Sequence, residues 1–233
     1  MPEDQRHKME LEGREAGLPL GEAVFRALRR ALQDGRYRPG DRLREEEVAR
    51  ELDVSRTPVR EAFGRLLGKG FVEPGAKGLI VRSLGTPEIL ELYAMREILE
   101  GAAARLAAQH ASPPEIEALT DLESAFGGEP DAAEMARLNR LFHRGIVGAA
   151  RNRYLRDALE ELQDAIALLG TTTFSVGGRP PTAAQEHEVI LAAIAARDAD
   201  KAEALARAHI REALRSRLKL IQDAERVGYG KVP

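Results

Sequence analysis

Apolar residues recur at helical spacing along most of the chain, and the sharpest stripe falls within residues 55–67. The stripe consists of Val59, Ala62, Phe63, Leu66 and Leu67. These residues stand at i, i+3, i+4, i+7 and i+8, the positions that share one buried face of a helix. Pro58 suits the first turn of such a helix, because an N–H missing there costs no intrahelical hydrogen bond. The pattern predicts a helix that buries one face against a core.

Two further helical patterns and a pair of extended runs surround this helix. The helical patterns cover residues 20–34 and 45–52, and only residues 53–55 separate the second pattern from the helix that follows. A turn of that length is typical of a helix-turn-helix. Runs of β-branched and aromatic residues at 70–74 and 79–82 flank a glycine-containing turn. They predict a β-hairpin, the wing of a winged helix.

The helical period continues from residue 84 almost to the end of the chain. The candidate helices are 88–109, 113–126, 132–150, 154–170, 182–196 and 199–222, with a longer loop at 174–181. We therefore predict a mainly α protein, in which an N-terminal winged helix-turn-helix precedes an all-helical bundle of six or seven helices. The predicted boundaries are a disordered tail at 1–17, the winged helix-turn-helix at 18–83, the helical domain at 84–224 and a second tail at 225–233.

Composition narrows the class of protein. The 233 residues include no cysteine, which excludes disulfides and thiolate metal ligands. No apolar run approaches the roughly 20 residues of a membrane span, and the N-terminus lacks a signal-peptide core. We expect a cytoplasmic protein with no membrane partner.

Charge is spread unevenly, although the formal net charge is only −3. Residues 18–83 hold 14 Lys and Arg against 10 Asp and Glu, a balance of +4. Residues 84–224 hold 16 against 22, a balance of −6. A basic module beside an acidic one favours polyanion binding by the first module only.

Short hydroxyl and guanidinium side chains gather at the start of the 55–67 helix. They are Ser55, Arg56, Thr57 and Arg60. A helix that buries its apolar stripe and directs arginines from its N-terminal end is suited to enter the major groove of DNA. Lys77, at the tip of the hairpin, is placed to reach phosphate or the minor groove, or is an ordinary solvated lysine.

Several strings in the chain carry a resemblance to a known family. In the first half they are Arg38-Pro39-Gly40-Asp41-Arg42-Leu43, Val48-Ala49-Arg50-Glu51-Leu52, Val54-Ser55-Arg56-Thr57-Pro58-Val59-Arg60-Glu61-Ala62 and Gly70-Phe71-Val72. In the second half they are Arg96-Glu97-Ile98-Leu99-Glu100, Phe142-His143, Glu186-His187 and Ala208-His209-Ile210. The first set resembles GntR-type winged-helix transcription regulators. The second set resembles the all-helical, ligand-binding FCD domain of their FadR branch.

The resemblance implies which residues contact double-stranded operator DNA. They are Ser55, Arg56, Thr57, Pro58 and Arg60, with the hairpin tip at Lys77 touching the backbone or minor groove. One departure concerns Glu46, which stands where many members carry a DNA-contacting arginine; Arg44 is the candidate substitute. Because a single short recognition helix reads few base pairs, we expect a homodimer on a pseudo-palindromic operator.

Spacing sets three of the five histidines apart. Asn139 and His143 stand at i and i+4, on one face of a predicted helix. His187 and His209 lie at similar distances on either side of the turn at 197–200. Two antiparallel helices joined at that turn would bring these two side chains level.

The resemblance assigns these residues to a metal site of one carboxylate and three histidines. Asn139 takes the carboxylate position, followed by His143, His187 and His209. Such nitrogen-rich sites suit a divalent ion such as Zn²⁺ or Ni²⁺. The amide of Asn139 is a neutral, weaker donor. A metal-free pocket, in which the histidines bind an anion directly, is the alternative.

The effector expected from the resemblance is a small organic acid. Arg96, Thr172 and Arg179 are its candidate contacts, and an internal ion pair with Glu100 is the other role open to Arg96. The leading hypothesis is a repressor whose operator binding is controlled by a carboxylate at the metal pocket. A regulator that senses the metal itself is the first alternative, and a metal-dependent enzyme is the remote one. The sequence around His187 lacks the His-Glu-x-x-His spacing of zinc hydrolases.

Overall fold

The computed structural model describes residue 11 and residues 17–76 and 78–229 of the chain. The chain divides into two compact units. The first contains the residues up to Gly85 together with Gln163–Gly170, and the second contains Thr86–Leu162 and the residues from Thr171 onward. Apart from residues 11 and 17, the predicted N-terminal tail lies outside the described residues.

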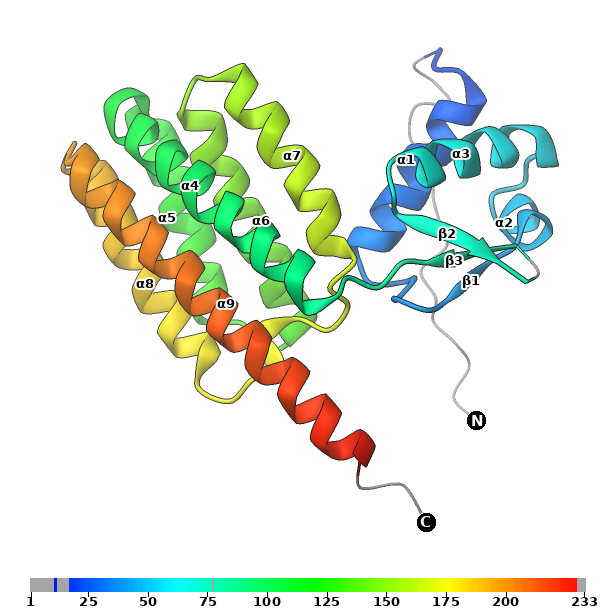
Figure 1. Cartoon of the computed structure of the whole chain (residues 1–233). Coiled ribbons are helices and arrows are strands. Elements are labelled where there is room, and N and C mark those ends of the chain that lie inside the picture. Colours follow the sequence, from blue (N-terminus) through cyan, green and yellow to red (C-terminus); the bar gives the residue numbers. More distant parts are fainter. Residues whose placement is uncertain (1–10, 12–16, 77, 230–233) are drawn as a thin grey trace. The chain divides into compact units, whose positions relative to one another are not determined.

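The first unit is a winged helix-turn-helix, as predicted (Figure 1). Its elements are α1 (Leu20–Gln33), β1 (Arg42–Leu43), α2 (Glu45–Glu51), α3 (Arg56–Gly68), β2 (Val72–Gly75) and β3 (Gly78–Val81). The antiparallel sheet has the order β1-β3-β2, with Leu43 opposite Leu79 and Val72 opposite Val81. Gly78 has a φ of +115°, and a Cβ there would lie 2.7 Å from the Leu43 carbonyl oxygen. Only glycine therefore allows β3 to approach β1 this closely.

The apolar face of α3 supplies much of the first unit's core. Val59 and Leu66 are fully buried there and share one cluster with Leu28 of α1. Leu168 joins the same cluster from the 163–170 segment, so a stretch far along the sequence completes this core. This contribution was not predicted from the periodicity.

The second unit is all-helical. Its elements are α4 (Thr86–His110), α5 (Pro113–Gly127), α6 (Ala132–Ala149), the part of α7 (Arg153–Ala167) up to Leu162, the 3-10 turn η1 (Thr173–Ser175), α8 (Arg179–Ala195) and α9 (Ala199–Tyr229). α9 packs along α4 and α8, and α5 packs against α6 and α8. At Gly101 a Cβ would lie 2.7 Å from Arg207 Cγ, so this glycine lets α4 and α9 pack closely.

Local signals explain where several of these helices begin. Ser112 and Glu115 form a capping box at α5, and the Asp131 carboxylate accepts hydrogen bonds from the first turn of α6. α8 begins at Arg179, earlier than the predicted residue 182, because Pro180 fits the first helical turn.

The last helix differs from the sequence prediction. α9 continues to Tyr229 and so occupies residues that were assigned to the tail at 225–233. No glycine or proline interrupts the chain between 199 and 227, so nothing stops the helix where the apolar stripe fades. Within the described part of the chain, no helix is long and apolar enough to cross a membrane.

Candidate functional site

The start of α3 presents its polar side chains to solvent. Ser55 precedes the helix in an extended conformation, and the burial of Val59 turns the opposite face outward. The side chains of Arg56 and Arg60 are 55% and 67% exposed. Thr57 is exposed beside them. These placements agree with a DNA-facing role for the start of α3.

Pro58 is buried, like Val59 beside it and unlike Arg56 and Thr57. Its predicted place among the DNA-facing residues therefore needs correction, because a buried ring offers no surface to DNA. Its ring sets the backbone angle of the first helical turn instead. Arg44 is exposed and donates to Glu47 at 2.8 Å, while Lys77 lies outside the described residues.

The two exposed arginines of α3 are paired with the first turn of α2. Arg60 donates Nε and Nη2 to Glu45 at 3.1 and 2.9 Å. Arg56 donates Nη2 to Glu45 at 3.2 Å and Nη1 to Glu46 at 3.1 Å. The hydrogen bond from Arg60 holds the pKa of Glu45 below its usual value, against the opposing effect of burial. Glu45 is therefore an anion at neutral pH.

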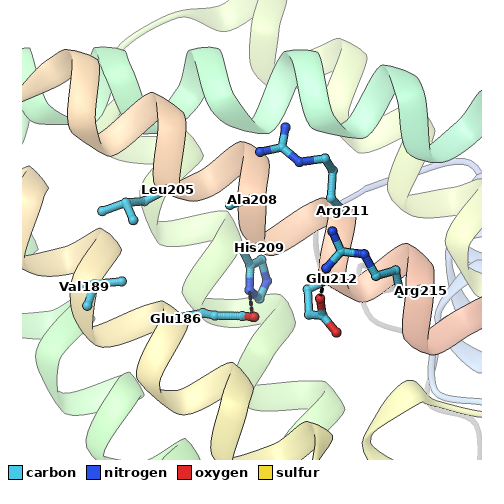
Figure 2. Close-up of a pocket in the computed structure, with 8 residues that line it drawn as sticks. All are labelled: Glu186, Val189, Leu205, Ala208, His209, Arg211, Glu212 and Arg215. Atoms are coloured by element: carbon cyan, nitrogen blue, oxygen red, sulfur yellow. Dashed lines mark hydrogen bonds and ion pairs between the residues drawn. The ribbon is translucent and has the colours of Figure 1, made fainter.

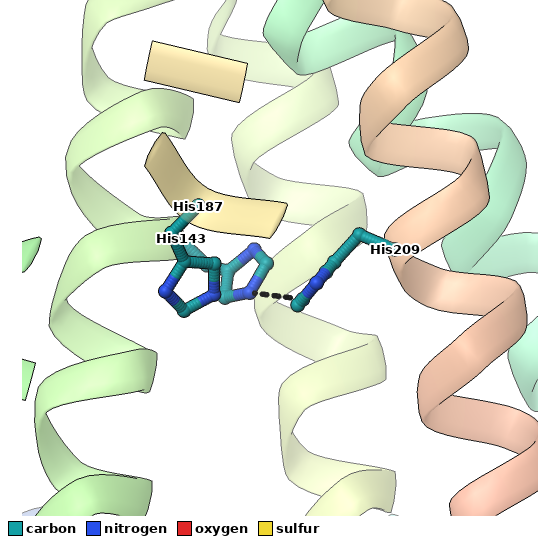
Figure 3. Close-up of side chains that lie close together, drawn as sticks. All are labelled: His143, His187 and His209. Atoms are coloured by element: carbon teal, nitrogen blue, oxygen red, sulfur yellow. Dashed lines mark hydrogen bonds between the residues drawn. The ribbon is translucent and has the colours of Figure 1, made fainter. Parts of the chain in front are cut away.

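Three buried histidines converge in the second unit (Figure 3). His143 comes from α6, His187 from α8 and His209 from α9. Each offers one nitrogen such that the three atoms lie within 4.8 Å of one another. The Nε2 atoms of His143 and His209 are 3.2 Å apart.

A carboxylate orients His143 from behind. Glu100 Oε2 lies 2.7 Å from His143 Nδ1, and Arg96 donates Nε to Glu100 Oε1 at 2.8 Å. Burial disfavours the charge on Glu100, but Arg96 and then His143 outweigh it and hold the Glu100 pKa well below its usual range. An anionic Glu100 accepts a hydrogen bond from Nδ1–H of His143, so Nε2 is the ring nitrogen that faces the cluster.

His209 has a matching arrangement. Its Nδ1 lies 2.7 Å from Glu186 Oε2, and Arg179 donates Nη1 to the same oxygen at 2.7 Å. Burial, followed by the neighbouring histidines and arginines, lowers the pKa of His187 and His209 well below the usual range. Both imidazoles are therefore neutral near pH 7, the form that binds metals.

The donor set fits a divalent metal ion. Both ring nitrogens of His187 and the Oδ1 atom of Asn139 are buried without a hydrogen-bond partner in the described structure. Bonds of about 2.0–2.1 Å at tetrahedral angles place two nitrogens about 3.3 Å apart, close to the 3.2 Å between His143 and His209. Three imidazole nitrogens suit Zn²⁺ or Ni²⁺, and the amide oxygen of Asn139 is the fourth donor expected from the sequence.

Two of the predicted effector contacts, Arg96 and Arg179, are paired with the carboxylates that contact the histidines. Arg96 is buried, paired with Glu100 and stacked over the Tyr93 ring at 4.8 Å. Arg179 is buried against Glu186 and His209. Both guanidinium groups support the carboxylates that orient the histidines. The Thr172 hydroxyl accepts from the Phe174 N–H at 3.3 Å and caps η1.

The structure adds two residues that the sequence reasoning did not place in the site. Glu100 was considered only as the partner of Arg96, and Glu186 only as the neighbour of His187. One signal could have found these two residues. Metal-binding histidines commonly donate their second N–H to a carboxylate, so a glutamate within reach of each histidine was to be expected.

Glu186 also lines a pocket between α8 and α9 with a volume of about 250 Å³ (Figure 2). Its carboxylate points toward His209, which lines the same pocket. The remaining lining residues are Val189, Leu205, Ala208, Arg211, Glu212 and Arg215. His209 therefore belongs both to this pocket and to the histidine cluster.

Similar proteins agree with this architecture. Residues 20–75 match the bacterial regulatory proteins of the gntR family, and residues 91–212 match the FCD domain. The Nta operon transcriptional regulator of Aminobacter aminovorans is 35% identical over 191 residues, covering 81% of this chain and 90% of that protein. The HTH-type transcriptional repressor RspR of Escherichia coli (strain K12) is 26% identical, covering 83% of this chain and 87% of that protein.

Solved structures show the same fold. E. coli McbR/YncC superposes with a TM-score of 0.79 at 22% identity, covering 88% of this chain and 99% of that chain. Both halves of the sequence thus match one family of regulators, in the order in which the structure places its two units. The chain belongs to the GntR family of bacterial regulatory proteins, in the branch with an FCD domain, and is a DNA-binding transcription regulator rather than an enzyme.

Proposed function

We propose that the protein is a repressor whose operator affinity is set by a small carboxylate bound at a divalent metal in the histidine cluster. The observation that carries this proposal is the convergence of His143, His187 and His209, two of them oriented by carboxylates. The buried cluster is costly to keep without a ligand, because the ring nitrogens of His187 have no hydrogen-bond partner among the residues that the structure describes. A metal ion would satisfy them.

Asn139, His143, His187 and His209 are the residues that would hold the ion. When bound, the metal would supply a Lewis acid able to accept a carboxylate oxygen from an effector. Because Asn139 is neutral, the four protein donors bring no negative charge of their own. An anionic effector would therefore meet a net positive centre, which favours carboxylates over neutral metabolites.

The repressor direction and the dimer rest on separate observations. The name of RspR, one of the similar proteins, describes it as a repressor. Leu90, Met95 and Ile98 of α4 are large apolar side chains that are 44–48% exposed. This face offers apolar area for a second copy, and two copies would read two half-sites of a pseudo-palindromic operator.

DNA binding measured by fluorescence anisotropy tests the proposal. The labelled DNA is the intergenic segment upstream of the gene, and the protein is used chelated, reloaded with Zn²⁺ or Ni²⁺, and reloaded in the presence of mono-, di- and tricarboxylates. We expect sequence-preferring binding that weakens only when metal and one class of carboxylate are both present. The salt concentration is held constant, because phosphate contacts make affinity strongly salt-dependent.

Two other outcomes would change the proposed function. If metal alone switches DNA affinity, the protein senses the metal. If carboxylates act equally on chelated protein and on a His143→Ala variant, the histidines do not carry the effector site. The Lys201→Ala variant is the matched control, since Lys201 lies on the exposed side of α9, away from both proposed sites.

A further inference from the structure

The exposed end of α3 carries ion pairs that differ between its two arginines. A guanidinium has a terminal edge, formed by Nη1 and Nη2, and a side edge, formed by Nε and Nη2. Each edge matches a two-atom acceptor such as a carboxylate, a phosphate or the O6 and N7 atoms of guanine. Which edge is occupied therefore decides what an arginine offers to DNA.

Arg60 has its side edge occupied. Glu45 accepts from Nε at 3.1 Å and from Nη2 at 2.9 Å, which leaves Nη1 and the outer hydrogen of Nη2 pointing away from α2. The free edge is the terminal one. Glu45 thus holds Arg60 in an orientation that presents a two-pronged donor to DNA.

Arg56 has its terminal edge occupied. Nη1 donates to Glu46 at 3.1 Å and Nη2 donates to Glu45 at 3.2 Å. The edge that would pair with guanine or phosphate is therefore shared between two carboxylates. Glu46 itself is 71% exposed, at the open end of the first turn of α2.

We propose that Glu46 is an internal competitor for operator DNA: its carboxylate caps the terminal edge of Arg56, so that Arg60 makes the first base contact and Arg56 engages only when this pair opens. The proposal rests on the DNA-binding role of α3 assigned above. Its consequence is a lower operator affinity than the arginines alone would give.

The balance of charges supports this direction. An exposed ion pair in water contributes little to stability, so the pair opens readily. Beside a DNA backbone, however, a carboxylate at the same place meets dense negative charge, and it also withholds a donor from phosphate. Removing the charge of Glu46 should therefore strengthen DNA binding.

Glu47 supplies the matched control. It carries the same charge one residue further along α2 and is 50% exposed, but it pairs with Arg44 at 2.8 Å and not with α3. A general effect of charge would act on both glutamates. A specific effect of the Arg56 pair would act on Glu46 alone.

The experiment compares wild type, Glu46→Gln and Glu47→Gln as full-length proteins. Each is titrated into the DNA fragment that wild type binds, over a series of salt concentrations, after thermal unfolding has shown equal stability. We expect Glu46→Gln to bind about three- to tenfold tighter and its slope of log K against log salt to steepen by about one, because Arg56 becomes an additional phosphate contact. Glu47→Gln releases Arg44 rather than Arg56, so any change that it causes should be the same with and without Arg56→Ala.

Arg56→Ala in all three backgrounds completes the test. It should cost more affinity in the Glu46→Gln protein than in wild type, since only there is Arg56 free to bind. An affinity gain in Glu46→Gln that persists when Arg56→Ala is also present, or weaker binding by Glu46→Gln, would overturn the proposal. Failure of wild type to prefer any fragment would instead overturn the DNA-binding role of α3, a separate and recognisable result.

Discussion

His187 is the member of the histidine cluster that no protein group orients. Its ring stacks on Phe142 with centroids 4.4 Å apart and approaches Phe126 at 5.0 Å, but neither nitrogen has a hydrogen-bond partner in the described structure. A buried polar group left unpaired costs about 1–3 kcal/mol. The residue therefore lowers stability in the absence of a ligand and is useful only when something binds it.

Replacing His187 with an apolar residue should separate stability from metal binding. We expect His187→Leu to leave the chelated protein as stable as wild type or up to about 2 kcal/mol more stable, because no unpaired nitrogens remain buried. Zn²⁺ affinity should fall by at least about tenfold, since one donor is lost. Denaturant titration of chelated protein and calorimetric Zn²⁺ titration measure the two effects. Strong destabilisation of the chelated variant would show that His187 has a packing role instead.

Glu186 should act on the metal site through His209. Glu186→Gln removes the charge that holds the Nδ1 proton but leaves all three imidazoles in place. We expect Zn²⁺ affinity to fall by about 10–100-fold, as is typical when the partner of a metal-binding histidine is changed. Glu188→Gln, on the exposed side of α8, is the control and should bind Zn²⁺ like wild type. If wild type, Glu186→Gln and Glu188→Gln bind Zn²⁺ with equal affinity, Glu186 does not take part in the metal site.

The buried imidazoles also predict a pH dependence for the chelated protein. The pKa values of His187 and His209 are lowered in the folded state from a usual value of 6.5. Below pH 6.5 the unfolded chain therefore binds more protons than the folded one, and stability falls as the pH falls. Each histidine contributes up to about 1.4 kcal/mol per pH unit. Denaturant midpoints at pH 7.5 and 5.5 should show this loss, and a midpoint unchanged over that range would contradict it.

At the scale of elements, a segment distant in sequence completes the first unit. Asp164 is buried and accepts hydrogen bonds from Arg29 and, at 3.0 Å, from Gln33 of α1. Leu168 enters the same core. Residues 163–170 are thus as much a part of this unit as its own helices.

Removing the Asp164 carboxylate should weaken the first unit. We expect Asp164→Ala to lower its free energy of unfolding by about 2–3 kcal/mol, because a charged, buried hydrogen-bond acceptor for Arg29 and Gln33 is lost. The exposed Asp157, earlier on α7, provides the control substitution Asp157→Ala. Hydrogen exchange of α1 measures the effect on this unit alone. Unchanged protection of α1 would mean that the 163–170 segment is dispensable there.

Helices with apolar stripes and the hairpin strands could be predicted from the sequence, and elements of only two or three residues could not. The stripe at 55–67 became α3, Arg56–Gly68, and the turn before it has helix-turn-helix length. β1 is only Arg42–Leu43 and η1 only Thr173–Ser175, too short for any periodicity to register. Their formation depends on partners distant in the sequence, such as Leu79 opposite Leu43.

The candidate site could likewise be predicted only in part. The levelling of His187 with His209 could be predicted from helix rise and the length of one turn, whereas only the resemblance to the FCD domain implied that His143 joins them. The pairing of Glu100 with His143 could not, since it depends on how α4 and α6 pack and on side-chain rotamers. The same holds for Glu45 and Glu46, whose contacts with α3 join two helices across a turn.

At the scale of the whole molecule, the proposed DNA contacts and the proposed ligand site fall in different units. The arginines of α3 lie in the first unit, and the histidine cluster lies in the second. The charge follows this division, since residues 18–83 carry an excess of basic side chains and residues 84–224 an excess of acidic ones. A substitution confined to one unit should therefore leave the binding site of the other unit structurally intact.

Arg60→Ala tests this separation. Loss of an arginine that reads a base costs about 1–3 kcal/mol in one half-site. A dimer would lose it twice, so operator affinity should fall by about 10²–10⁴-fold, down to the level of non-specific binding. Arg60 is 67% exposed and packs into no core, so thermal stability and Zn²⁺ affinity should match wild type. If Arg60→Ala binds the operator as tightly as wild type, Arg60 does not read a base. A parallel loss of Zn²⁺ binding would show that the two units do not act independently, because no residue of the histidine cluster has been altered.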